Sequence, residues 1–145
     1  GGERKLMPNA ITLDDLILLA EKGMGWKKVV DGAVAPPGTF WVCVDTGLLL
    51  FRPKGHIGPG HAWSPYTNLR HAGMLMRALG ISLILSTQDA MPGVWMAQAW
   101  SSAAEVVAFG RAGDAGDDEA AMCEAVCQCA LKVLKARKEA LSTKT

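Results

Sequence analysis

Residues 81–109 read ISLILSTQDAMPGVWMAQAWSSAAEVVAF and contain three strand-like runs with no helix between them. The runs cover residues 81–87, 94–100 and about 104–109, and a Pro-Gly turn and a Ser-Ser pair separate them. Such short connections are typical of an antiparallel meander, because antiparallel neighbours can be joined by a tight turn. The stretch therefore predicts a three-stranded antiparallel sheet.

A helix is predicted on each side of this sheet. Ahead of it, the cap and turn residues 63–68 lead into apolar residues at helical spacing that stop at Gly80, which predicts a helix over 67–79. Behind it, Asp114 or Asp117 can cap a long helix. The apolar stripe of that helix comprises Met122, Val126, Cys129, Ala130, Val133 and Leu134. Residues 62–140 thus form a predicted α-β-β-β-α core of the α+β class.

The segment ahead of this core, residues 11–61, begins with a predicted helix over 12–22. Thr12 can cap it, and Asp15 places a carboxylate in its first turn. Glycines at 23 and 25 end it, and Trp26 follows as a predicted core residue.

A short β-hairpin is predicted next in the same segment. Apolar runs at 40–44 and 48–51 flank Asp45-Thr46-Gly47, a turn whose glycine can adopt the left-handed conformation. The Pro/Gly-rich stretch 52–61 is a predicted loop.

Length and composition indicate one compact domain. The chain has 145 residues, of which 50% are apolar and 20% are charged, as in ordinary globular proteins. Residues 1–10 are interpreted as an expression-tag remnant and tail, because they begin Gly-Gly and hold no apolar signal core. No apolar run reaches the length of about 18 residues that a membrane helix needs, so we expect a cytoplasmic protein without a membrane partner.

Three features of the core resemble the phage ABA sandwich domain, which occurs in small phage and prophage proteins. They are the Trp63-Ser64-Pro65 entry to a helix, the strand pair after Gly80, and the Gly- and Asp-rich turn into a terminal helix with alanines and cysteines. The helix ending Gly23-Met24-Gly25-Trp26, with a further tryptophan at Trp41, is similar to the start of such proteins. The resemblance implies a phage or prophage origin, hence a bacterial host cytoplasm, and an α-β-β-β-α layer. It implies no activity and no active-site residues.

Double-stranded-RNA-binding domains share this order of elements, so RNA binding is an alternative. Those domains place a basic cluster at the start of their second helix, where it meets phosphates. The corresponding stretch here, 114–119 (DAGDDE), holds four acidic residues that would repel phosphates. The sequence therefore disfavours this binding mode.

Basic residues gather instead on the C-terminal helix, at Lys132, Lys135, Arg137 and Lys138. They form either a solvated face that suits the helix dipole or a phosphate-binding strip. Aromatic residues that could stack on bases do not accompany them, and the net charge of +1 attracts no polyanion. Nucleic acid is therefore the second choice of partner.

The sequence predicts no catalytic residue, no cofactor and no metal site. Cys123 and Cys127 share a helix face, but Cys129 points about 200° away from Cys127, so three sulfurs cannot converge on one ion. The three histidines show no metal-ligand spacing, and no phosphate-binding loop motif is present. A small enzyme that pairs Cys43 with a histidine is the least favoured alternative.

Trp95 and Trp100 carry the strongest functional hint. They lie five apart in one predicted strand, so they point to opposite faces of the sheet. The helices of the core cover one face, and the other is covered either by the N-terminal helix and hairpin or by a second copy or another protein. We predict an interaction surface that includes Trp95, Trp100 and the four basic residues, in a non-enzymatic module that binds a host or phage protein or itself.

Overall fold

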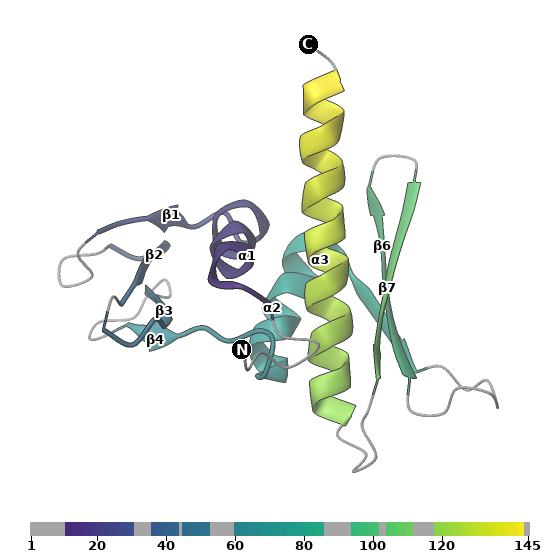
Figure 1. Cartoon of the computed structure of the whole chain (residues 1–145), viewed down its shortest axis with the longest axis horizontal. Helices are drawn as coiled ribbons and strands as arrows, with labels where there is room; N and C mark the ends of the chain where they lie inside the picture. Colours follow the sequence, from purple (N-terminus) through teal and green to yellow (C-terminus); the bar gives the residue numbers. More distant parts are fainter. Residues whose placement is uncertain are drawn as a thin grey trace, which may run out of the picture.

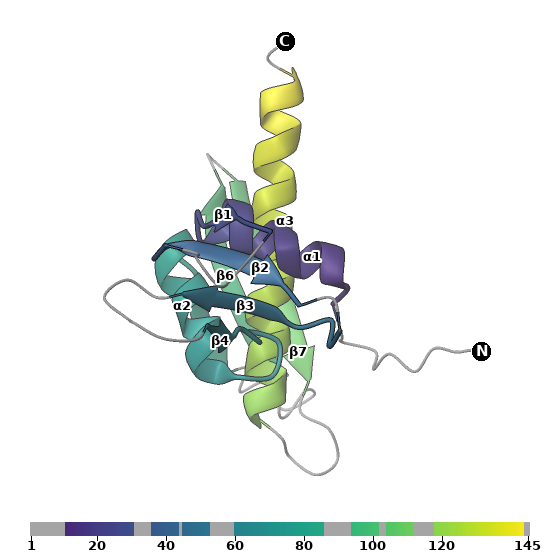
Figure 2. The same cartoon turned by 90° about the vertical axis from the view of Figure 1, so that its left-hand side faces the viewer.

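The computed structural model describes residues 11–30, 36–43, 45–52, 60–85, 94–101, 104–111 and 118–143. In that part of the chain the fold is mixed α+β, with three helices and two sheets. The long helix α3 (Asp118–Thr143) stands between the three-stranded sheet and the other two helices (Figure 1). The four-stranded sheet lies beyond those two helices, as the perpendicular view in Figure 2 also shows.

The N-terminal helix forms as predicted. α1 spans Leu13–Leu18 and continues through one π-helical turn, η1, over Leu19–Gly23. The Thr12 hydroxyl accepts a hydrogen bond from the backbone N–H of Asp15 at 3.1 Å, so it satisfies one of the free N–H groups of the first turn.

The predicted hairpin is confirmed and belongs to a larger sheet. β2 (Thr39–Val42) and β3 (Leu49–Arg52) pair antiparallel, while β1 (Lys27–Lys28) adds parallel to β2 and β4 (His61–Ala62) adds antiparallel to β3. Both ends of the predicted loop 52–61 are therefore in strands, and residues 53–59 lie outside the described part. The sequence did not reveal β1 and β4 because a two-residue strand carries no alternation.

An aromatic cluster holds this sheet to the rest of the fold. The Trp26 ring stacks on Phe51 at a centroid distance of 4.7 Å and meets the edge of Trp63 at 5.0 Å. Trp63 is only 1% exposed. Trp26 is therefore part of the packed interior, as predicted, and joins the hairpin to the entry of the next helix.

α2 (Leu69–Leu79) has the caps that its sequence predicts. The Asn68 side chain accepts hydrogen bonds from the backbone N–H groups of Arg70 and His71, at 2.9 and 3.2 Å. The helix ends at Gly80, whose φ of 69° lies in the left-handed region where glycine is unstrained.

The three-stranded antiparallel sheet is confirmed. β5 (Ser82–Leu85), β6 (Val94–Ser101) and β7 (Ala104–Arg111) lie in sequence order, so β6 is central. The predicted turn before residue 94 lies outside the described residues.

α3 is buried on two sides between Ala121 and Leu134, where the sequence predicted one stripe. Its predicted cap, Asp114 or Asp117, lies outside the described residues. The buried positions are Ala121, Cys123, Ala125, Val126, Cys127, Cys129, Ala130, Leu131, Val133 and Leu134. Small alanine and cysteine side chains let α3 pack against the sheet on one side and against α2 and η1 on the other.

This arrangement decides what covers the sheet. The N-terminal helix and hairpin lie on the far side of α3, away from β5, β6 and β7 (Figures 1 and 2). The expectation that they cover the second face of the sheet is therefore wrong for the described residues. The physical reason is that α3 has a second apolar side, and the N-terminal segment and α2 pack against it.

Candidate functional site

The sheet face that points away from α3, called the outer face below, carries large apolar side chains. Across the strands, Ile84 is paired with Met96, which is paired with Phe109. Because paired residues in antiparallel strands share a face, these three side chains form one apolar row. Ile84 is 46% exposed and Phe109 is 54% exposed.

Trp100 lies on the same face, near the end of the sheet where β6 ends and β7 begins. It lies four residues after Met96 on β6, so it points to the same side, and it is 64% exposed. Val107 lies two residues from Phe109 and connects the apolar row to the tryptophan. By strand register, the outer face thus comprises positions Ser82, Ile84, Val94, Met96, Gln98, Trp100, Glu105, Val107, Phe109 and Arg111.

The polar groups on the outer face bond to each other. Gln98 of β6 donates a hydrogen bond from its side-chain amide to the Glu105 carboxylate on β7. Arg111, at the end of β7, is paired with Val94 and occupies the last register position of the same face. The face therefore offers an apolar surface with one carboxylate that is already engaged.

The inner face explains why α3 covers only one side of the sheet. Ala97 and Ala108 are paired across β6 and β7 and are buried, and Gly110 lies directly against α3. Such small residues bring the helix close to the strands. Trp95 shares this inner face, packs against the core, and donates its indole N–H to Asp118 at 3.2 Å.

The two tryptophans of the predicted interaction surface are thus separated by the sheet. Trp95 is held against the start of α3, and Trp100 is open on the outer face. Trp100 was predicted from the sequence as part of the surface, whereas Ile84 and Phe109 were not. Their position on the outer face depends on strand pairing, which the sequence does not show. The apolar residues in 81–85 and 104–109 were the signal in the sequence that could have pointed to them.

The four basic residues are all exposed on α3, and they differ in their contacts. The Lys132 ammonium donates a hydrogen bond to the backbone carbonyl of Val107 at 2.9 Å, so it binds to the edge strand β7. Lys135, Arg137 and Lys138 are exposed on the last turns of α3. Glu139 lies four residues after Lys135, on the same side of the helix, and offsets its charge.

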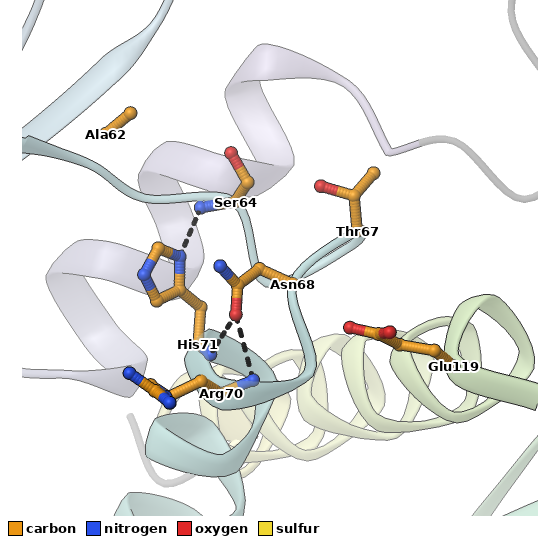
Figure 3. Close-up of a pocket in the computed structure, with 7 residues that line it drawn as sticks. All are labelled: Ala62, Ser64, Thr67, Asn68, Arg70, His71 and Glu119. Carbon is orange, nitrogen blue, oxygen red and sulfur yellow. Dashed lines mark hydrogen bonds between the residues drawn. The ribbon is translucent and has the colours of Figure 1, made fainter.

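A polar cavity of about 710 Å³ lies at the start of α2 (Figure 3). Its lining residues are Ala62, Ser64, Thr67, Asn68, Arg70, His71 and Glu119. His71 Nδ1 accepts a hydrogen bond from the backbone N–H of Ser64 at 2.9 Å. Burial, with the positive charges of Arg70 and His61 next in importance, lowers the pKa of His71, so the ring is neutral at pH 7.

The interactions inside this cavity are structural. Asn68 caps α2, and Glu119 of α3 accepts the backbone N–H of Leu69 at 3.2 Å. Within the described part of the chain, the hydrogen-bond partner of the His71 ring is the Ser64 backbone N–H and not a nucleophilic side chain. The hydrogen bonds around the cavity therefore join α2 to the segment after β4 and to α3. They do not pair a nucleophile with a base, as covalent catalysis requires.

The cysteines of α3 are buried thiols. Burial raises the pKa of Cys127, and it raises the pKa of Cys129 to about 11. Cys129 points to β7, where its sulfur contacts the Val106 carbonyl at 3.7 Å. Within the described residues, no three His, Cys, Asp or Glu side chains gather closely enough to hold a metal ion.

No known family, curated protein or solved structure matches this chain. Among the described residues, no helix combines the length and the apolar character needed to cross a membrane.

Proposed function

We propose that the protein is a non-enzymatic binding module whose outer face docks an amphipathic helix of a partner protein. One observation carries the proposal: Ile84, Trp100 and Phe109 are each about half exposed or more, on one face of one sheet. Exposed apolar patches of this kind are typical of interaction sites in soluble proteins.

The size of the outer face favours a helix as its occupant. β6 and β7 are eight residues long and β5 is four residues long. At about 4.8 Å between strands and about 3.3 Å per residue, the face is roughly 26 Å long and roughly 14 Å wide where β5 is present. A helix of about 18 residues has this length and is about 10 Å wide. The inner face of the same sheet is already covered by a single helix, α3.

A second copy stacked face to face fits the outer face less well. The face measures roughly 320 Å² by the same strand spacings, less than half of the roughly 800 Å² that each partner buries in a standard interface. A partner protein whose helix lies on the outer face can also contact this chain beyond the sheet, so the area of the face does not limit the area of the interface. The partner is therefore a different protein. The resemblance to the phage ABA sandwich domain implies that this partner is a host or phage protein.

Nucleic-acid binding through the C-terminal helix has weaker support. Lys132 bonds to β7, and Glu139 lies among the remaining basic residues. An enzymatic function also has weaker support, because the described polar cavity holds no nucleophile and base in contact.

The test is affinity capture from bacterial lysate, with nuclease and at raised salt, using the wild type and a variant with Ile84→Lys, Trp100→Lys and Phe109→Lys together. The proposal expects a protein captured by the wild type and lost by the variant, because three ammonium groups cannot be buried under an apolar helix. Val30→Lys is the matched control, since Val30 is 98% exposed and lies in the N-terminal half. Capture that survives the triple substitution would contradict the proposal.

A further inference from the structure

A second surface, independent of the outer face, lies along α2. A groove of about 510 Å³ is lined by Met24, Arg70, Gly73, Met74, Arg77 and Ala78, and is called the α2 groove below. Residues 70, 73, 74 and 77 share one side of the helix because they are three and four positions apart. This groove was not predicted from the sequence.

Gly73 is the first sign that the groove has a role beyond packing. It lies in the interior of α2, where glycine costs about 1 kcal/mol relative to alanine. A Cβ atom built at this position would meet no described atom within 4 Å, so no described neighbour requires the glycine. Gly73 therefore weakens its own helix and leaves open space beside it, which is expected of residues with a functional rather than a packing role.

The charges around the groove are the second sign. Arg70 and Arg77 stand seven residues apart on α2, which separates them by about 10.5 Å along the helix axis. Neither guanidinium forms an ion pair within the described part of the chain. Glu119, near Arg70 in the adjoining cavity, accepts the backbone N–H of Leu69.

The floor between the two arginines is apolar and adaptable. Met24 and Met74 contribute flexible thioether side chains that can reshape around an occupant. Methionine and arginine are also enriched at protein–protein interfaces. A phosphate backbone would meet the arginines but would gain nothing from this floor.

We infer that the α2 groove binds an acidic amphipathic helix of a protein, with one or two apolar side chains over Gly73. Carboxylates seven residues apart on that helix match the spacing of Arg70 and Arg77 and accept charge-assisted hydrogen bonds from both guanidiniums. This inference does not rest on the function proposed for the outer face, because the two surfaces lie on different elements.

The probe is a fluorescent peptide of about 15 residues, long enough to populate a helix on an alanine-rich background. It carries glutamates at positions i and i+7 and leucines at i+3 and i+4. Its affinity for the full chain is measured by anisotropy at about 0.15 M salt. A matched peptide has glutamine at both glutamate positions.

The inference predicts that the wild type binds the glutamate peptide and binds the glutamine peptide at least ten-fold more weakly. Arg77→Gln weakens binding of the glutamate peptide roughly ten-fold, because one charge-assisted bond is lost. Gly73→Leu abolishes binding by filling the groove, and it raises the melting temperature because leucine is the better helix former. A loss of binding therefore cannot come from unfolding.

Charge reversal makes the test specific. The double variant Arg70→Glu and Arg77→Glu should lose the glutamate peptide and bind a peptide with lysines at the same two positions. The inference is overturned if the wild type does not bind the glutamate peptide at up to about 1 mM, or if Gly73→Leu binds it as well as the wild type does. Equal or tighter arginine-dependent binding to duplex DNA or to anionic lipid vesicles would also overturn it.

Discussion

Gly110 of β7 lies so close to α3 that a Cβ atom at position 110 would overlap the backbone carbonyl oxygen of Ala121. The overlap is with backbone, which cannot rotate away as a side chain can. This contact fixes α3 on the inner face of the sheet and leaves the outer face uncovered.

Gly110→Ala should therefore destabilise the fold. We expect a loss of about 3 kcal/mol in the free energy of unfolding, as for an overpacked core, measured by urea titration with tryptophan fluorescence. Gly73→Ala is the matched control, since its Cβ meets no described atom, and it should gain about 1 kcal/mol. A Gly110→Ala chain as stable as the wild type would show that α3 does not pack this closely.

The stability of the fold should depend on pH through His71. Because its pKa is lowered in the folded state, the unfolded chain binds the proton more tightly than the folded chain does. The stabilisation is complete above the unfolded pKa of about 6.5 and is lost as pH falls below it toward the folded pKa. Urea titrations between about pH 7.5 and pH 5 should show this decline.

The control for His71 is His71→Asn, whose side-chain oxygen can still accept the Ser64 N–H but does not titrate. This variant should show a smaller decline in stability over the same pH window. An identical decline in both chains would assign the effect to other groups.

The four cysteines should differ sharply in reactivity. A hydrogen bond from the Thr46 side chain is the main cause that lowers the pKa of Cys43, and Cys43 is not buried. Cys123, Cys127 and Cys129 are buried, and burial raises the pKa of the last two. Brief alkylation of the native chain, read by peptide mass spectrometry, should modify Cys43 alone.

Thr46→Val provides the comparison for Cys43. Removal of the hydroxyl should raise the pKa of Cys43 and slow its alkylation below about pH 8. Modification of the α3 cysteines in the native chain would mean that the helix is less well covered than the structure shows.

The sequence predicted the elements whose signal is local. The capped helices α1 and α2, the β2–β3 hairpin and the meander of β5 to β7 each have periodicity and turn residues within one short stretch. β1 and β4 were missed because they consist of two residues and exist only through pairing with β2 and β3.

The packing of α3 could not be predicted in the same way. Its second buried side is made of alanine and cysteine, which are small enough to look neutral in a helical pattern. Because this second side was not recognised in the sequence, the N-terminal segment was expected to pack on the sheet. The tertiary contact between Gly110 of β7 and Ala121 of the following helix decides the arrangement instead.

The candidate site was predicted in part. Alternation in residues 94–100 placed Trp95 and Trp100 on opposite faces, and Trp100 is the exposed one. The row of Ile84, Met96 and Phe109 depends on the register of three strands, which no single strand encodes. Lys132 was grouped with the other three basic residues because its bond to the Val107 carbonyl is not visible in the sequence.

The most direct measurement of the central claim is site-specific photo-crosslinking in bacterial cells from a benzophenone amino acid at Phe109, with the same group at Val30 as the control. The account predicts that the Phe109 position crosslinks to one partner protein, that the crosslinked peptide lies on the apolar side of an amphipathic helix, and that Val30 does not give this product. The same products from both positions, or crosslinks from Phe109 only to further copies of this chain, would contradict it.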